Sequence, residues 1–321
     1  MLITGGAGFV GSHLVDWYLS GGARVVAVDN FITGSRSNLA HLSGEQKFKL
    51  VEYDVTEDFT RVMSSLETFG RPDIVLHLAS PASPVDYGRY PIETMRVNSI
   101  GTERTLSAAA EWGASFLFAS TSEAYGDPTV SPQPETYWGN VNPVGVRSCY
   151  DESKRYGEAL VSAFARAGAD ARIVRIFNTY GPRMALDDGR VVPNFIKQAL
   201  LGESLTVYGD GRQTRSFCYV SDLVEGIGRC AASDKTRGLV TNLGSPREET
   251  IGEFARIVAS VVGVPLRCEY RPLPADDPMQ RRPDITRARA LLDWEPRVDL
   301  EIGLKRTVDD FSRRILPSKA R

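Results

Sequence analysis

The sequence has few of the residues that bind metals, and it has no long apolar segment. Only three histidines and four cysteines occur in 321 residues, and no two cysteines form a Cys-x-x-Cys pair. This scarcity argues against a zinc site, a disulfide scaffold and a catalytic triad that depends on histidine. No stretch approaches the ~18 uninterrupted apolar residues of a membrane-spanning helix, and Met1 leads directly into strand-like residues instead of a signal sequence. We therefore expect no resident metal, no membrane association and a cytoplasmic location.

Charge of predominantly one sign is also missing. The chain carries 38 basic and 40 acidic residues, which are interspersed and give a formal net charge of -2. It therefore lacks the basic patch that would indicate a nucleic-acid partner. With 42% hydrophobic and 24% charged residues, the composition is that of an ordinary globular protein with one large unit or two closely joined units.

Six short runs rich in β-branched residues alternate with helical patterns up to about residue 180. The runs lie at residues 2–4, 24–29, 48–54, 73–79, 115–120 and 172–177. This alternation predicts an α/β fold with a Rossmann-type, doubly wound parallel sheet. Beyond residue 180 glycine and proline become frequent, and helices are predicted at 192–201, 251–262 and 286–292. We expect residues 1–180 to form the sheet domain, and residues 181–321 to form a smaller substrate-binding domain that exchanges some strand or helix with the first.

A glycine-rich turn follows the first predicted strand. Gly6, Gly8 and Gly11 satisfy the pattern G-x-G-x-x-G and open a helix with apolar residues at helical spacing. Such glycines permit a tight turn and a close approach of backbone to a pyrophosphate at the positive end of the helix. Asp29 lies 18 residues after Gly11, where a carboxylate accepts hydrogen bonds from both ribose hydroxyls of an adenosine. NAD is therefore favoured over NADP, although Arg36 lies close enough in sequence to weaken this preference.

The remaining cofactor contacts are predicted at the carboxyl ends of the other strands, where ligands of such sheets bind. A glycine-rich turn without any ligand is the alternative. The predicted cofactor-binding residues are Gly5, Gly8, Phe9, Val10, Gly11, Asp29, Asn30, Arg36, Asp54, Val55, Leu78, Ala79, Ser80, Tyr150 and Lys154.

Tyr150 and Lys154 lie four residues apart in a predicted helix, so the phenol and the ammonium share one face. A nearby cation lowers the pKa of a phenol, which makes Tyr150 a candidate base in hydride transfer. Thr121, Ser122 and Glu123 come shortly after an apolar run at 116–119 and complete the candidate catalytic group. Taken alone, a Tyr-x-x-x-Lys pair also occurs by chance in helices, and Glu123 would be a solvated loop acid.

Several longer phrases of the sequence are distinctive. They are HLASPASP at 77–84, TSEAYGDP at 121–128, YWGNVNP at 137–143, RSCYDE at 147–152, RIFNTYGPR at 175–183, DGRVV at 188–192, DDP at 276–278 and RRPD at 281–284. Together they resemble the extended short-chain dehydrogenase/reductase family, which includes NAD-dependent epimerases and dehydratases, and within it the branch of UDP-glucuronate decarboxylases. The resemblance covers nearly the whole chain.

In that family Thr121, Tyr150 and Lys154 would form the dehydrogenase triad. The decarboxylase-type glutamate would fall on Glu123, and the arginine of the C-terminal motif on Arg281. The resemblance implies NAD-dependent conversion of UDP-glucuronate to UDP-xylose and CO2 through a 4-keto intermediate. Arginine forks suit phosphate oxygens, although any of these arginines could instead pair with a carboxylate. The expected substrate-binding residues are Asn178, Arg183, Arg190, Val191, Tyr208, Arg215 and Arg281.

Two other interpretations stay open at this point. One is a 4-epimerase or a 4,6-dehydratase that acts on a neutral nucleotide sugar. The other, more distant, is a non-catalytic regulator that binds NAD. The resemblance also implies a homodimer joined by a four-helix bundle, with residues 92–112 and 150–166 of each subunit forming the bundle.

Overall fold

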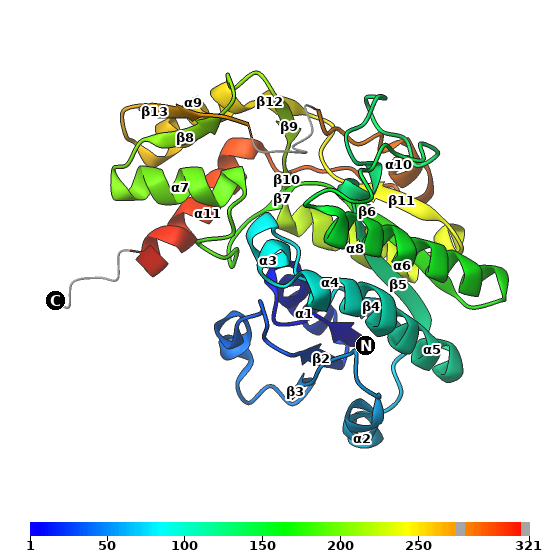
Figure 1. Cartoon of the computed structure of the whole chain (residues 1–321). Coiled ribbons are helices and arrows are strands. Elements are labelled where there is room, and N and C mark those ends of the chain that lie inside the picture. The colour runs from blue at the N-terminus through cyan, green and yellow to red at the C-terminus, as the bar shows by residue number, and fades with distance from the viewer. Residues whose placement is uncertain (274–279, 316–321) are drawn as a thin grey trace.

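The structure of the chain is a computed structural model that describes residues 1–273 and 280–315 (Figure 1). The phrase DDP at 276–278 therefore lies outside the described residues. None of the helices in the described ranges has both the length and the apolar composition needed to cross a bilayer.

A seven-stranded parallel sheet forms the centre of the molecule. Its strands are β1 (Leu2–Thr4), β2 (Val25–Asp29), β3 (Phe48–Glu52), β4 (Ile74–His77), β5 (Ser115–Thr121), β6 (Ala171–Ile176) and β11 (Val240–Leu243). They follow the order β11-β6-β5-β4-β1-β2-β3, so the chain reverses its direction of travel across the sheet between β1 and β4. The predicted Rossmann-type fold and its six strands are confirmed. Ligands of such sheets bind at this point of reversal, beyond the carboxyl ends of the strands.

The seventh strand, β11, was not predicted. It has only four residues and pairs in parallel with β6, after the chain has passed through its C-terminal elements. A run this short carries little periodicity, so its place at the edge of the sheet depends on a partner that is distant in sequence. The chain therefore returns to the main sheet well beyond residue 180.

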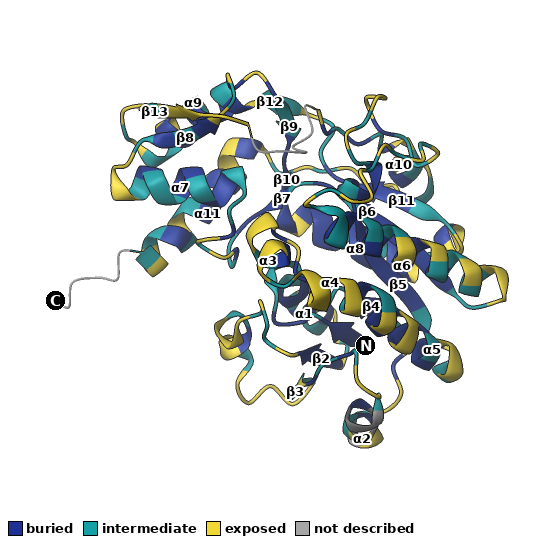
Figure 2. Cartoon of the chain, in the orientation of Figure 1, coloured by how far each residue is buried: buried dark blue, intermediate teal, exposed yellow. Residues whose placement is uncertain are grey.

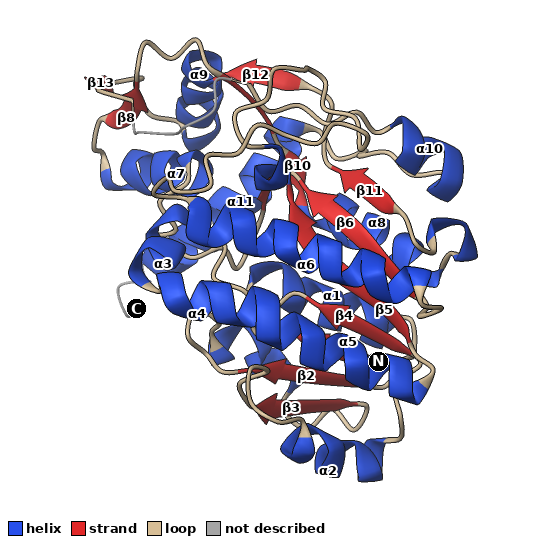
Figure 3. Ribbon diagram, turned by 45° about the vertical axis from the view of Figure 1, so that its right-hand side comes forward, coloured by secondary structure: helices blue, strands red, loops and turns tan. Residues whose placement is uncertain are grey.

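Helices cover both faces of the sheet (Figure 3). One face is covered by α1 (Phe9–Ser20) and α8 (Val220–Ala232), and the other by α2 (Thr60–Phe69), α5 (Thr102–Trp112) and α6 (Ser148–Arg166). Successive strand residues point to opposite faces: Ile3 and Ala27 pack on the α1 side, whereas Leu2 and Val26 pack on the α5 side. Burial on both faces explains why these strands are apolar throughout (Figure 2).

Most of the C-terminal elements gather beside the carboxyl ends of the strands, at the upper left of Figure 1. Phe217 and Phe254 stack there with their ring centroids 4.3 Å apart. The predicted helices at 192–201, 251–262 and 286–292 are confirmed. The elements are α7 (Val191–Leu201), α9 (Ile251–Val262), α10 (Thr286–Leu292), α11 (Leu300–Ile315) and the strand pairs β7 (Thr179–Tyr180) with β10 (Cys218–Tyr219), β8 (Leu205–Tyr208) with β13 (Cys268–Arg271), and β9 (Thr214–Ser216) with β12 (Glu248–Thr250). Of these, α10 lies apart from the others, beside β11 at the right of Figure 1.

Shorter helical segments complete the described chain. Three of them, α3, α4 and η2, lead into α5, and α4 and η2 also pack beside α6. The segments are η1 (Arg36–Leu42), α3 (Pro84–Arg89), α4 (Pro91–Arg96), η2 (Val97–Gly101), η3 (Ser122–Tyr125) and η4 (Asp234–Thr236).

The helix α6 packs unusually close to β5 at Gly157. A Cβ atom at this position would lie 2.5 Å from Cζ of Phe118, a fully buried β5 residue, and 3.2 Å from the carbonyl oxygen of Asn98. Any side chain larger than hydrogen would therefore push α6 away from the sheet.

We expect Gly157→Ala to lower the free energy of unfolding by about 1–3 kcal/mol, because overpacking outweighs the better helix propensity of alanine. Urea unfolding of the purified variant measures this change. The matched control is Gly88→Ala in α3, where no atom lies within 4 Å of the new methyl group. The control should be neutral or gain up to about 1 kcal/mol; equal effects of the two substitutions would contradict the packing argument.

Candidate active site

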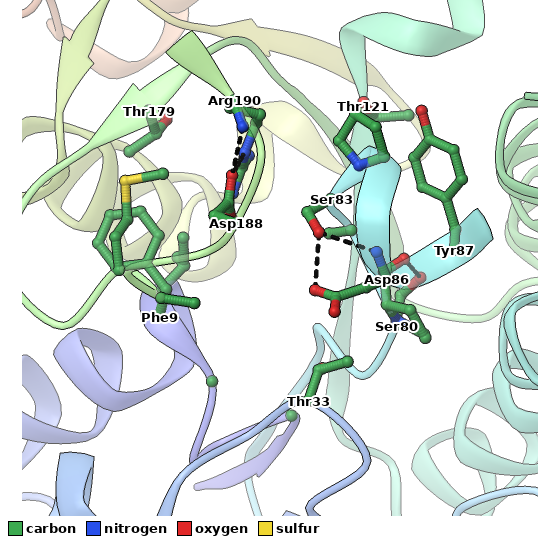
Figure 4. A pocket seen from close by; sticks show the side chains of 18 of the residues that line it. Phe9, Thr33, Ser80, Ser83, Asp86, Tyr87, Thr121, Thr179, Asp188 and Arg190 are labelled. Carbon is green, nitrogen blue, oxygen red and sulfur yellow. Dashed lines mark hydrogen bonds and ion pairs between the residues drawn. The ribbon is translucent and has the colours of Figure 1, made fainter. Parts of the chain in front are cut away.

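A cavity of about 830 Å³ opens at the carboxyl ends of the strands, between the sheet and the C-terminal elements (Figure 4). Every candidate site residue predicted from the sequence lines it, with the exception of Arg36. The guanidinium of Arg36 pairs instead with Glu52 on β3 and lies 4.1 Å from the centroid of the Phe31 ring. Of the predicted site residues, Arg36 thus lies outside the cavity, and all the others lie at its wall.

The glycine turn leaves room for a phosphate group. A Cβ atom on Gly11 would lie 2.0 Å from the carbonyl oxygen of Gly5, and Gly5 itself has a φ of +69° that favours glycine. Only glycines at these positions let α1 start this close to the end of β1. The helix has no side-chain cap at Gly8, and its first residues line the cavity. Its free N-terminal amides therefore fit the pyrophosphate of a dinucleotide.

Asp29 lies at the end of β2, where the sequence predicts a carboxylate that binds the adenosine ribose of the cofactor. Its Oδ2 accepts a hydrogen bond from the amide of Ala7 at 2.9 Å, and its Oδ1 accepts one from the amide of Phe31 at 2.8 Å. Burial raises the pKa of Asp29, and these two backbone hydrogen bonds oppose the rise. Nearby, Asn30 Nδ2 donates to Asp54 Oδ2 at 2.9 Å. A fixed acid here accepts ribose hydroxyls and leaves no place for a 2′-phosphate, so these residues fit NAD.

The predicted hydride-transfer residues meet where β5 ends. The phenol of Tyr150 and the hydroxyl of Thr121 share a hydrogen bond. Lys154 Nζ donates to the carbonyl oxygen of Ala119 at 2.8 Å and lies 5.9 Å from the centroid of the Tyr150 ring. The structure thus brings together three residues that are up to 33 positions apart, and their order along α6 sets the spacing of the phenol and the ammonium.

The expectation that Lys154 lowers the pKa of Tyr150 is wrong for the protein chain by itself. Burial raises the pKa of Tyr150 to about 12, and the hydrogen bond with Thr121 only partly opposes this rise. Burial also lowers the pKa of Lys154 to about 7. The physical reason is that water is excluded from both groups, which penalises a phenolate and an ammonium alike.

Glu123 is held between two arginines. Arg281 Nη1 donates to its Oε1, and Arg147 Nη2 donates to its Oε2 at 2.5 Å. Burial opposes ionisation of Glu123, but Arg281 and Arg147 together outweigh it and hold the pKa of this carboxyl below its usual range. Arg281 is itself fixed, because its Nη2 donates to the carbonyl oxygen of Gly126 at 3.2 Å. Besides the effect of burial, the Tyr150 phenol feels the charges of Glu123 and Asp151, which raise its pKa, and that of Arg190, which opposes them.

Sequence reasoning missed two residues of this group. Arg147 received no role, although it stands three residues before Tyr150, a separation that places both on one side of a helix start. Tyr87, on α3, stacks on Tyr150 with ring centroids 5.1 Å apart and an interplanar angle of 11°. No spacing links Tyr87 to Tyr150 in the sequence, because only the packing of α3 against α6 brings them together.

The predicted phosphate-binding side chains also line the cavity, and Figure 4 shows Arg190 and Asp188 across the cavity from Thr121. Arg190 Nε and Nη2 donate to the two carboxylate oxygens of Asp188 at 2.5 and 2.6 Å. Arg183 Nη2 lies 2.7 Å from Asp16 Oδ2 on α1. Arg215 Nη1 donates to the carbonyl oxygen of Thr214 at 2.8 Å. Asn178, Val191 and Tyr208 line the cavity as well. The wall is thus rich in guanidinium groups that are already oriented by neighbouring acceptors.

Comparison with known proteins gives one family. Residues 1–244 match the model of the NAD dependent epimerase/dehydratase family. A curated relative, UDP-glucuronic acid decarboxylase 1 of Arabidopsis thaliana, is 51% identical over 317 residues, which cover 98% of this chain and 70% of that protein.

Two solved structures extend the comparison to the fold. The UDP-glucose 4-epimerase of Thermotoga maritima with UDP-glucose has a TM-score of 0.87 and 32% identity, covering 98% of this chain and 99% of that chain. A dTDP-glucose 4,6-dehydratase of Streptomyces venezuelae with NAD bound has a TM-score of 0.87 and 26% identity, covering 97% of this chain and 96% of that chain.

Proposed function

The chain belongs to the NAD-dependent epimerase/dehydratase family, and we propose that within it this protein is a UDP-glucuronate decarboxylase. Its reaction is UDP-glucuronate to UDP-xylose and CO2, with NAD regenerated in each turnover. The observation that carries this function is the group of Arg281, Glu123 and Arg147 beside Tyr150. A substrate with its own carboxylate needs such cations, whereas a neutral sugar does not. The identity of about half of all residues with a curated decarboxylase supports the same conclusion.

The residues of the first domain, 1–180, hold the cofactor in this proposal. The glycine turn at Gly5 to Gly11 receives the pyrophosphate, and Asp29 receives the adenosine ribose. The chemistry that bound NAD supplies is removal of a hydride from C4 of the sugar and its later return, which makes a transient C4 ketone. Tyr150 takes the C4 hydroxyl proton, Thr121 hydrogen-bonds the C4 oxygen, and Lys154 holds the phenol and the nicotinamide ribose.

The two arginines and Glu123 then act on the carboxylate attached to C5. The guanidiniums of Arg281 and Arg147 flank Glu123, and the buried Asp151, whose pKa burial raises to about 7, interacts with the same group. While Asp151 is protonated, the cations outnumber the ionised carboxylates, which suits a substrate carboxylate. The negative charge of Glu123 repels that carboxylate, and the repulsion is relieved when the carboxylate leaves as neutral CO2. The C5–carboxyl bond breaks, its electron pair moves into the C4 ketone, and a proton is added at C5. Because Glu123 is ionised, it does not supply this proton, and in this proposal the proton comes from solvent; Ser122, buried next to Glu123, completes the polar lining.

The second domain, residues 181–321, holds the nucleotide diphosphate in this proposal. Arg183, Arg190 and Arg215 lie on its side of the cavity, and their forks match phosphate oxygens. The nucleotide is thereby anchored at one wall while the sugar reaches Tyr150 at the other.

The test of this function is incubation of the purified protein with UDP-glucuronate and a trace of NAD. Proton NMR follows the sugar, and released CO2 is trapped and measured. We expect UDP-xylose over many turnovers. Conversion of UDP-glucose or UDP-galactose, without reaction of UDP-glucuronate, would instead favour the 4-epimerase or 4,6-dehydratase function of the solved structures. A stoichiometric NAD complex that turns over no nucleotide sugar would favour the interpretation as a non-catalytic regulator.

Tyr150→Phe should bind NAD with wild-type affinity and lose at least about a thousandfold in turnover, because the variant keeps the ring but cannot accept the C4 proton. Cofactor binding is measured by fluorescence titration, and turnover by the NMR assay. Residual activity near the wild-type rate would exclude Tyr150 as the base.

Glu123→Gln should retain NAD binding and slow decarboxylation at least tenfold, since the substitution removes the like charge beside the leaving carboxylate. The matched control is Glu152→Gln on α6, which alters a half-exposed carboxylate that pairs only with Arg155 among the described ion pairs. The control should stay within twofold of wild type. If Glu123→Gln and the control behave alike in the CO2 assay, the role given to Glu123 is wrong.

A homodimer is the proposed assembly, formed by α4, η2, α5 and α6 of two subunits. These segments pack side by side and expose Ile92 (54%), Met95 (45%), Ile100 (41%) and Tyr156 (50%) to solvent. Ile92→Asp combined with Met95→Asp should yield monomers in sedimentation velocity at micromolar protein. The control, Ile302→Asp, changes an equally exposed residue on α11 and should leave the dimer intact. A monomeric wild-type protein would refute this assembly.

A cytoplasmic location is proposed from the state of the cysteines. All four are free thiols in the structure, and two of them, Cys218 and Cys230, are buried. Cell fractionation with an antibody to the native protein tests this proposal; recovery in a secretory compartment would refute it.

A further inference from the structure

A buried carboxylate lies behind the candidate catalytic lysine. Glu158 follows Lys154 by one turn of α6, so the two side chains share a face of the helix. Lys154 is 2% exposed and Glu158 is 8% exposed. The close approach of α6 to β5 at the adjacent Gly157 presses this face against the sheet. None of the steps described above uses Glu158.

The carboxylate of Glu158 is fixed by three hydrogen bonds. Its Oε1 accepts from Ser120 Oγ at 2.5 Å and from Arg175 Nε at 2.8 Å, and its Oε2 accepts from Arg175 Nη2 at 2.6 Å. Arg175 is held in turn, because its guanidinium lies 4.5 Å from the centroid of the Tyr125 ring and Tyr125 Oη donates to Asn242 Oδ1 at 2.8 Å. Glu158 is thus attached to β5, β6 and, through this chain of contacts, β11.

Three successive residues of β5 form hydrogen bonds with side chains from three successive turns of α6. The carbonyl of Ala119 accepts from Lys154, Ser120 donates to Glu158, and Thr121 shares a hydrogen bond with Tyr150. A shift of the helix along the strand would break all three contacts together. Glu158 therefore fixes the register in which Lys154 and Tyr150 meet the cavity.

Glu158 also acts on the charge of Lys154. Burial lowers the pKa of Lys154, and the charge of Glu158 opposes this effect. The other groups that face the lysine are Tyr150 on its own helix, His77 on β4 and, beyond Glu158, Arg175 on β6. Burial, with a further contribution from Lys154, lowers the pKa of His77 to about 3, so His77 stays neutral at working pH. Among the charged groups of residues 1–273 and 280–315 that face the lysine, only Glu158 favours the ammonium.

We propose that Glu158 is a positioning residue for Lys154: it keeps the lysine protonated and fixes it against the end of β5. The role in turnover rests on the proposed function, whereas the electrostatic and geometric role does not. A purely structural carboxylate, present only to neutralise Arg175, would leave the titration of Lys154 unchanged. The two roles are therefore separable by experiment.

The first test is NMR titration of the NAD-loaded protein labelled with ¹³C at lysine Cε. The chain has seven lysines, and Lys154→Arg assigns the resonance of interest. In Glu158→Gln we expect the titration midpoint of Lys154 to fall by at least about one pH unit, because the variant keeps the shape but removes the charge. Glu158→Asp, which restores the charge, should return the midpoint toward wild type.

Asp170→Asn is the matched control. Asp170 pairs with the buried Arg172 and with Arg237 at the far end of β6, so this variant disturbs a comparable ion pair at a distance from Lys154. Its Lys154 midpoint should equal that of wild type. An unchanged midpoint in Glu158→Gln, or an equal shift in the control, overturns the proposal.

Ser120→Ala provides a second route if Glu158→Gln does not fold. It removes one of the three hydrogen bonds that fix Glu158 near the lysine, so the Lys154 midpoint should fall, by less than in Glu158→Gln. A rise or no change would overturn the proposal.

The second test is the pH profile of UDP-glucuronate turnover. In wild type, kcat should decline on the alkaline side of the profile, where Lys154 loses its proton. In Glu158→Gln this decline should begin at a lower pH, while KM changes less than twofold. If wild type itself does not turn over UDP-glucuronate but the NMR midpoint shifts as expected, the proposed function fails and the positioning role stands. If wild type turns over and neither profile nor midpoint moves, the positioning role fails alone.

Discussion

The close packing of α6 against the end of β5 is the constraint on which the rest of the active site depends. Gly157 permits this approach because any Cβ would meet the ring of Phe118. The contact lets Lys154 reach the carbonyl of Ala119 and brings Tyr150 to Thr121. Were the helix displaced by a few ångströms, each of these polar groups would be buried without its partner, which is a costly arrangement. Packing of apolar groups thus determines where the reactive groups lie.

Exclusion of water from this contact sets the electrostatics. In the chain alone, burial raises the pKa of Tyr150, which keeps the phenol protonated, and lowers the pKa of Lys154. The phenol therefore needs more than one helical cation to act as a base at neutral pH. The positive charge of the nicotinamide ring would add to that of Lys154 once NAD is bound, and both favour an ionised phenol. A site of this kind is poised to react only when its ligands are in place.

The C-terminal part of the chain supplies what the first six strands cannot. Arg281 lies beyond β11 in sequence, yet it reaches Glu123 at the end of β5, 158 positions earlier in the chain. With Arg147 it holds Glu123 ionised in a buried place, because two guanidiniums outweigh the cost of desolvation. The cavity thus holds the predicted hydride-transfer residues at the end of β5 and, beside them, a charged group that suits a carboxylate. The joining of these two parts explains how a common fold serves a substrate with an acidic sugar.

The sequence by itself determined the fold class, the glycine turn, Asp29 and the Tyr150–Lys154 spacing. These features depend on residues that are close along the chain, where periodicity and the geometry of one helix or one turn suffice. Resemblance to a family added Glu123 and Arg281. Only the tertiary structure decided that β11 joins the main sheet, that Tyr87 stacks on Tyr150, that Arg36 turns away to Glu52, and that burial raises the pKa of Tyr150. Each of these depends on contacts between segments far apart in sequence and on exclusion of water, and no local pattern records either.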